Sequence, residues 1–357
     1  MRSDRFARVL AAVNREIPDK VPWWLWTHFP ALPWLRYYSW EKSTRDGEEL
    51  ARAHLAFLQQ LDYKMDLLKV TSWHFGSFQW GTKWRFTNND EYPQKVEVPV
   101  KQTEDWRKLW VLDPKKELRE WLRTISILSR EIGRTMPFMF TIHSPMMQAL
   151  HQVSTPERVY ADMKSHPDAL KEGLETITQT CIDFSKACIN EGAPGIFYGI
   201  GGGGQTWSRM DRRQLEEFQL HYDKKVLEAV RDLPVKMLHI CGKTGEDPQT
   251  NGGLMESGWF KQYAVDAINW WDTRYTSAST AKKIYGDKFC VCAGLDQDIT
   301  KTGTPEQVEN QVKKAIDSTA KGGGFMIASG CTVLTPAPLE NINAVGRAVE
   351  KYGRYSR

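Results

Sequence analysis

One histidine and two cysteines have the types and spacing that most clearly indicate chemistry. His239 and Cys241 are two residues apart in the apolar run 235–241, and Cys331 follows a second apolar run at 325–330. Residues at i and i+2 of a β-strand face the same side, so His239 and Cys241 can reach one ion. An imidazole and two thiolates suit zinc and leave its fourth tetrahedral position for a substrate, as in catalytic sites. The pattern predicts such a site at His239, Cys241 and Cys331.

Other interpretations of these residues remain open. All three could be ordinary core residues. A nucleophilic dyad of Cys241 with His239 is disfavoured, because side chains at i and i+2 of a strand stand about 6–7 Å apart. The other four cysteines share a strand face or a helix face and could be small buried hydrophobes: Cys290 with Cys292, and Cys181 with Cys188.

The elements that must position these residues alternate along the chain. Short β-rich apolar runs are followed by segments with apolar residues at three- and four-residue steps, which is typical of βα units. Eight strands are predicted, at 21–26, 66–70, 138–143, 195–200, 235–241, 267–272, 289–295 and 325–330. Helices are predicted at 48–62, 167–190, 211–232, 304–320 and 339–352. The pattern predicts one α/β domain over 1–357, a (β/α)8 TIM barrel with its active site at the C-terminal strand ends.

Residues 73–112 interrupt this alternation. The segment is long, aromatic and polar, and it has no helical period. It is predicted to be an elaborated loop or small hairpin inserted after strand two. Insertions after the strands of such a barrel lie on its catalytic face.

Composition excludes several classes of protein. The net charge of +4 is too small to indicate nucleic acid or an anionic membrane as a partner. No apolar run reaches the roughly 18 residues of a spanning helix, and the N-terminus lacks a secretory signal pattern. Six cysteines in 357 residues are too few for a disulfide scaffold. These features predict a cytoplasmic protein.

Tryptophan is over-represented, with 15 residues that gather near the N-terminus. Trp24 and Trp26 share one face of the first predicted strand, and Trp23 faces the other way. As a set, the tryptophans predict a hydrophobic lid or pocket at the barrel mouth, with ordinary packing as the alternative. The candidate substrate-binding residues of this mouth are Trp24, Trp26, His28, His74, His143 and Asp296.

These motifs resemble the uroporphyrinogen decarboxylase superfamily, and within it the zinc-dependent, corrinoid-linked methyltransferase branch. The likeness extends over nearly the whole chain. It is carried by RFARVLAAVNREIPDKVP at 5–22, HICG at 239–242, GLD at 294–296, TGTPE at 302–306, GCTVLTP at 330–336 and ENI at 340–342.

The region after strand one distinguishes the branches. The decarboxylase has an Arg-Gln-Ala-Gly-Arg stretch there that holds carboxylates, whereas this chain has WWLWTHFP at 23–30. Porphyrinogen decarboxylation is therefore not expected. The methyltransferase branch binds zinc through a His-x-Cys pair and a distant Cys, which this sequence matches at His239, Cys241 and Cys331.

The resemblance implies a zinc-dependent methyltransferase. It would move a methyl group between a methylcobalamin-type corrinoid, carried by a partner protein, and a small-molecule donor or acceptor such as a thiol or a folate. A homodimer is compatible with the family. The alternatives are a decarboxylase-like lyase that acts without metal and a non-catalytic corrinoid or tetrapyrrole binder. Aromatic residues in place of arginines predict an uncharged or cationic methylated substrate, such as a methoxyarene or a methylammonium.

Overall fold

The structure is a computed structural model that describes residues 4–27, 39–71, 76–86, 93–201, 209–242, 253–333 and 337–355. Two predicted substrate-binding residues, His28 and His74, lie outside these ranges. In the part of the chain that is described, no helix is long and apolar enough to cross a membrane.

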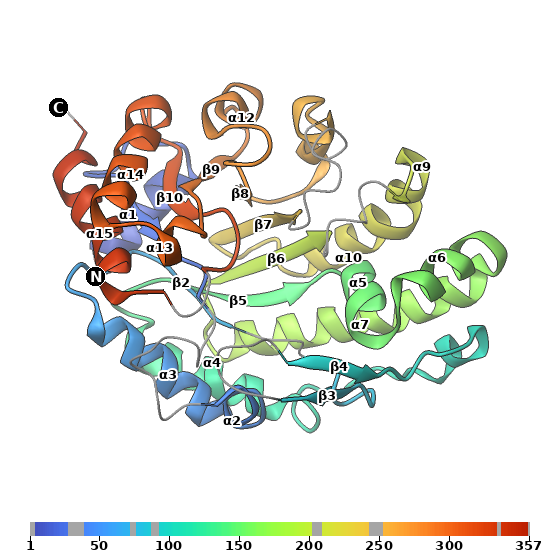
Figure 1. The fold of residues 1–357 in the computed structure, drawn as a ribbon. Helices are drawn as coiled ribbons and strands as arrows, with labels where there is room; N and C mark the ends of the chain where they lie inside the picture. The colour runs from blue at the N-terminus through green and yellow to red at the C-terminus, as the bar shows by residue number, and fades with distance from the viewer. Residues whose placement is uncertain are drawn as a thin grey trace.

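Eight strands form one parallel sheet in the order β1-β10-β9-β8-β7-β6-β5-β2 (Figure 1). The backbone N–H of Asp66 donates to the carbonyl of Trp23 at 3.0 Å, which links the two ends of the sheet. The predicted TIM barrel is thus confirmed. The strands are β1 (Trp23–Trp24), β2 (Leu68–Lys69), β5 (Phe138–His143), β6 (Gly195–Gly201), β7 (Val235–Cys241), β8 (Ala267–Trp270), β9 (Cys290–Leu295) and β10 (Phe325–Ser329).

Helices surround the barrel, and α1 packs Val9, Ala12 and Val13 against its interior. The predicted helix 211–232 is divided by a π-helical segment, η3. The α-helices are α1 (Asp4–Val13), α2 (Trp40–Arg45), α3 (Gly47–Gln60), α4 (Arg119–Ile132), α5 (Pro145–Gln148), α6 (Pro156–Ser165), α7 (Pro167–Asn190), α9 (Arg212–Gln214), α10 (His221–Ala229), α12 (Ala278–Tyr285), α13 (Ile299–Thr302), α14 (Pro305–Thr319) and α15 (Leu339–Tyr352). The π-helical segments are η2 (Ala149–Val153) and η3 (Leu215–Leu220), and the 3-10 segments are η1 (Thr103–Lys108) and η4 (Trp259–Gln262).

The insertion after β2 contains an antiparallel hairpin of β3 (Lys83–Arg85) and β4 (Gln94–Glu97), followed by η1, as predicted for 73–112. It docks on the chain that follows β5. The Thr82 hydroxyl donates to the carbonyl of Gln152 at 2.6 Å, and the Lys95 ammonium donates to the carbonyl of Ser154 at 2.7 Å. The insertion therefore braces η2 at the C-terminal end of β5.

Apolar residues form one layer inside the barrel and another between the barrel and its helices. Trp24 and Trp26 lie in the inner layer, and Trp23 lies in the outer layer, as the strand alternation predicts. Cys290 and Cys292 belong to the inner layer and are fully buried. Burial raises the pKa of the Cys292 thiol, so it is a neutral packing residue. Cys181 and Cys188 are core residues of α7 in the outer layer.

The predicted tryptophan lid does not include Trp80, which packs in the outer layer instead. Trp80 and Trp106 are buried in the outer layer. Trp84 packs with Phe78 and Phe86 against Trp40 in a separate small cluster. An insertion of this length needs apolar residues to fix it on the barrel, and Trp80 and Trp106 serve that purpose.

A buried carboxyl network joins three elements on the barrel's outer side. Asp223 of α10 accepts hydrogen bonds from the Tyr198 hydroxyl of β6 at 2.6 Å and from the Tyr263 hydroxyl after η4 at 2.9 Å. Burial raises the pKa of Asp223 to about 7, against these hydrogen bonds, which lower it. Burial therefore disfavours the charged form of the Asp223 carboxyl group in the native protein.

Substituting Asp223→Asn is expected to flatten the pH dependence of stability. Because the native pKa lies above the value of about 3.9 for an unfolded chain, the native state binds the extra proton between those two values. This group therefore contributes less stability as pH rises from about 4 to about 7. Thermal melts at pH 5 and pH 7.5 should show a smaller loss of Tm for the variant than for the wild type. Equal losses would contradict the assignment.

Candidate active site and metal centre

The strand register places polar residues of three strands at one level of the barrel. His143 of β5 pairs with Gly199 of β6, Gly199 pairs with His239 of β7, and His239 pairs with Asn269 of β8. Gly199 has a steric role, since a Cβ there would lie 3.2 Å from the Cδ2 of His143. The level lies near the C-terminal strand ends, where barrel enzymes hold their active sites.

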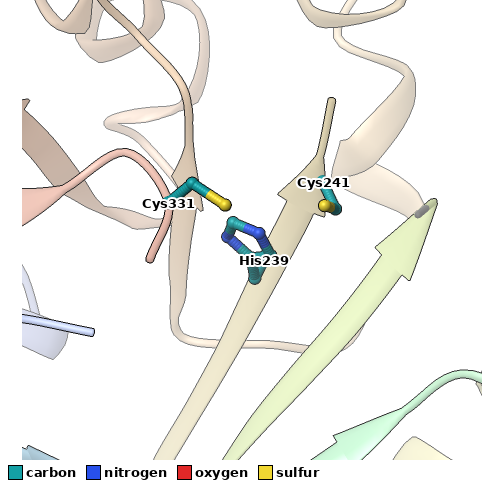
Figure 2. A group of neighbouring side chains, drawn as sticks. All are labelled: His239, Cys241 and Cys331. Carbon is teal, nitrogen blue, oxygen red and sulfur yellow. The ribbon is translucent and has the colours of Figure 1, made fainter. Parts of the chain in front are cut away.

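His239, Cys241 and Cys331 converge at this level. A ring nitrogen of His239 and the two sulfur atoms lie within 4.8 Å of one another, and all three side chains are buried. Figure 2 shows the Cys331 thiol pointing toward the imidazole, with Cys241 farther along β7. Within the described ranges, this is the one cluster of at least three histidine, cysteine or acidic side chains arranged to hold a metal ion.

Gly330 allows Cys331 to reach across the barrel mouth. Strands β8 and β9 separate β10 from β7 in the sheet, so the chain after β10 has to lean inward. A Cβ at position 330 would stand 2.8 Å from the Cα of Trp271, at the end of β8. A glycine permits this close backbone approach, which brings the Cys331 thiol to His239.

Asn269 sets the tautomer of His239. Its Nδ2 donates to the carbonyls of Cys292 at 2.8 Å and Ser329 at 3.1 Å, so its Oδ1 is the acceptor. That Oδ1 lies 2.7 Å from Nδ1 of His239, which therefore carries the proton. Nε2 is left with its lone pair, is buried, and makes no hydrogen bond within the described ranges. This is the state in which an imidazole binds a metal ion.

The cluster favours a thiolate at Cys331. A hydrogen bond with Cys241 is the largest cause that lowers the pKa of Cys331 well below its usual value. Burial acts in the opposite direction but is outweighed. A thiolate is the form of cysteine that binds metal ions.

Two aromatic rings and one lysine pack around the site among the described residues. The ring of Trp26 meets that of His239 edge-on at 4.8 Å, and Phe197 stacks on His239 at 5.3 Å. The ammonium of Lys69 lies 4.3 Å from the Trp26 ring centre. Lys69 and Asn269 were not predicted from the sequence. Their signal is a polar residue within an apolar run of a barrel strand, where both faces are buried.

The remaining predicted residues have different surroundings. Trp24 is fully buried and packs edge-on against Phe197 at 5.9 Å, within the inner core. His143 is buried with its Nδ1 2.8 Å from the side-chain nitrogen of Gln152. Burial, followed by the nearby Lys69 charge, lowers the pKa of His143 to about 3, so its imidazole is neutral. Asp296 is partly exposed and accepts hydrogen bonds from the Asp298 N–H of its own loop at 2.8 Å and from the Thr273 hydroxyl, after β8, at 3.1 Å.

Comparison with known proteins identifies the family. Residues 4–352 match the sequence profile of uroporphyrinogen decarboxylase (URO-D). The chain belongs to this family. The superfamily resemblance in the motifs is thus confirmed. The match covers the barrel from α1 to α15.

Relatives within the family carry two kinds of name. A uroporphyrinogen decarboxylase from Pseudoalteromonas translucida is 25% identical over 269 residues, which cover 72% of each chain. A methylcobamide:CoM methyltransferase from Methanosarcina mazei is 24% identical over 267 residues, which cover 73% of this chain and 72% of that one. A solved structure of a methyltransferase from Methanosarcina mazei shares the fold with a TM-score of 0.81 and 18% identity, covering 99% of each chain.

Proposed function

We propose that this chain is a zinc-dependent methyltransferase that transfers a methyl group between a corrinoid and a small-molecule partner, with a thiol as the favoured acceptor. The cluster of His239, Cys241 and Cys331 is the observation that carries the proposal. The methylcobamide methyltransferases among the relatives support a corrinoid as the second reactant. A partner protein that carries the corrinoid is part of the proposal.

The residues present fit a zinc ion. The site has one nitrogen and two sulfur donors, which is a common zinc ligand set. Asn269 fixes the imidazole with its Nε2 lone pair available, and the buried Nε2 makes no competing hydrogen bond among the described residues. Bound there, zinc would supply a Lewis acid that stabilises the thiolate form of a substrate thiol.

The surrounding side chains orient this site and restrict water. Asn269 holds the imidazole plane through a hydrogen bond that is itself fixed by two carbonyl groups. Trp26 and Phe197 pack on the same imidazole and exclude water from that side. His143 is neutral and lies two strands away at the same level, so it adds no charge that would compete with a metal ion.

A decarboxylase-like lyase that acts without metal is the competing function. It is supported by the relatives that carry the decarboxylase name. The composition of the site favours the methyltransferase, because a metal-free lyase has no use for two thiols that converge on an imidazole with a free lone pair. Cytoplasmic location and homodimeric assembly stay predictions.

Metal analysis followed by a methyl-transfer assay tests the proposal. Purified protein is expected to hold about one zinc ion per chain, consistent with the one three-ligand cluster among the described residues. Methylcobalamin should lose its methyl group in the presence of the protein and a suitable thiol, with tetrahydrofolate as the alternative acceptor. An active protein free of metal, or turnover that requires neither a corrinoid nor a methyl acceptor, would refute the proposal and favour the lyase.

A further inference from the structure

Two thiols at the barrel mouth lie close enough to react with each other. Cys241 is the last residue of β7 and Cys331 follows β10, and their sulfur atoms lie within 4.8 Å of one another. A hydrogen bond joins the two side chains. All six cysteines of the chain are free. A disulfide requires the two sulfur atoms to approach to about 2.05 Å, and rotation of two cysteine side chains that already touch brings them together.

These two thiols are also the ones that solvent reaches. Cys241 is 7% exposed and Cys331 is 8% exposed, whereas the other four cysteines are completely buried. Because cysteine oxidation follows exposure, a small hydroperoxide that enters the mouth meets this pair first. Cys181 illustrates the contrast, since burial raises its pKa to about 12 and keeps the thiol protonated.

A second thiol pair in the same barrel provides a natural comparison. The side chains of Cys290 and Cys292 are hydrogen-bonded to each other, and both lie in the inner layer of the core. They belong to one strand, β9, where residues i and i+2 stand about 6–7 Å apart and point the same way. That separation is at the long end of the range of about 4.4–6.8 Å between the Cα atoms of a disulfide. This pair has neither the access nor the geometry of the pair at the mouth.

We propose that Cys241 and Cys331 are an oxidation site, at which a hydroperoxide forms an intramolecular disulfide, and that this disulfide and a bound zinc ion exclude each other. The disulfide itself does not depend on the proposed function, and only its competition with zinc rests on it. The bond would link the end of β7 to the chain after β10 and withdraw two of the three donors of the candidate metal centre. Oxidation would therefore inactivate the site until a thiol reductant restores it.

The reaction balances in two steps. One cysteine, as its thiolate, attacks an oxygen of hydrogen peroxide, which breaks the O–O bond, forms a sulfenic acid and releases water. The second thiol then attacks the sulfenic sulfur, forms the S–S bond and releases a second water. The two sulfur atoms lose two electrons in total. The peroxide takes up these electrons together with the two thiol protons.

Thiol counting and peptide mapping of the peroxide-treated protein test the inference. Metal-free wild-type protein is treated with hydrogen peroxide, alkylated under denaturing conditions and weighed by mass spectrometry. Six alkylated cysteines are expected before treatment and, with two joined in the disulfide, four after it. The peptides that contain Cys241 and Cys331 should be linked, and dithiothreitol should restore all six thiols. Zinc-loaded protein should react at least about tenfold more slowly, since an ion that binds only the reduced pair protects it by mass action.

Two variants separate the pair from a single reactive thiol. In Cys241→Ser, the remaining Cys331 has no resolving partner, so oxidation should stop at a sulfenic acid that dimedone traps. The matched control is Cys290→Ser, which removes a buried thiol of the second pair and should still form the disulfide at the wild-type rate. Thermal melting checks that both variants fold.

The peptide map of the wild type decides the outcome even if Cys241→Ser does not fold. The inference is overturned if treated wild type keeps six thiols while free cysteine in the same solution is consumed. A disulfide that maps to Cys290 and Cys292 instead would also overturn it, as would oxidation of the mouth thiols to sulfinic acids without a disulfide.

The same measurements distinguish this inference from the proposed function. If the disulfide forms but the reduced protein takes up no zinc, the oxidation site stands and the methyltransferase proposal fails. If zinc binds but the metal-free thiols do not form a disulfide, the metal site stands and the oxidation site is refuted. If the disulfide-linked protein binds as much zinc as the reduced protein, mutual exclusion is refuted.

Discussion

Replacing Cys331 by serine is expected to remove zinc from the protein and methyl transfer with it. The substitution takes away one of three protein ligands and the thiolate that the cluster stabilises. Loss of an outer-shell partner already costs about 10- to 100-fold in metal affinity or activity, so loss of a ligand should exceed about 100-fold. Cys241→Ser should behave in the same way. Zinc content after gel filtration and the initial rate of methylcobalamin demethylation measure both effects.

Cys290→Ser is the matched control for these variants. Cys290 is also buried inside the barrel, but it lies outside the three-residue cluster. The control introduces the same change from thiol to hydroxyl and should lower stability by about 1–3 kcal/mol, as a buried polar group does, without loss of zinc. A Cys331→Ser protein with a full complement of zinc and the wild-type rate would show that the cluster is not the metal site.

Replacing Asn269 by leucine is expected to weaken zinc binding by about 10- to 100-fold, although Asn269 is not a predicted ligand. The variant cannot accept the Nδ1 proton of His239, so the imidazole is no longer held in the tautomer that presents Nε2. It also leaves the carbonyls of Cys292 and Ser329 without the donor they have in the native protein. Unfolding free energy should fall by about 2–4 kcal/mol. Competition with a zinc chelator measures the affinity.

Asn341→Leu separates the effect on the metal site from the effect on stability. The side-chain amide of Asn341 also donates to two carbonyls, those of Thr300 at 3.1 Å and Gly303 at 2.9 Å, but it does not contact His239. Its substitution should cost a similar free energy of unfolding and leave zinc affinity unchanged. If both variants weaken zinc binding equally, Asn269 acts through stability alone.

Because a βα barrel is regular, much of this fold can be predicted from the sequence. Apolar runs that alternate with helical spacing predicted all eight strands of the sheet, and α7 and α15 match their predicted ranges of 167–190 and 339–352. The hairpin insertion after β2 followed from the break in that alternation. These features depend on local sequence periods, because each strand and helix must bury a defined face.

In the candidate site too, local spacing predicted some features and not others. The spacing of His239 and Cys241 on one strand indicated that they share a face, and the alternation of Trp23 and Trp24 correctly separated the outer from the inner layer. The positions of some insertion tryptophans, such as Trp80, were misjudged. Their number is visible in the sequence, but whether each ring packs beneath a loop or lines a mouth depends on where the insertion docks, which local periodicity does not specify.

The sequence by itself determined the barrel, the strand faces and the donor types of the candidate metal site. The tertiary structure alone decided which side chains meet. The register that aligns His239 with Asn269, the inward path of the chain at Gly330, and the contact of the Lys69 ammonium with the Trp26 ring all arise from contacts between distant strands. Barrel closure sets those contacts, because the shear between strands fixes which residues share a level, and no local period in the chain encodes that shear.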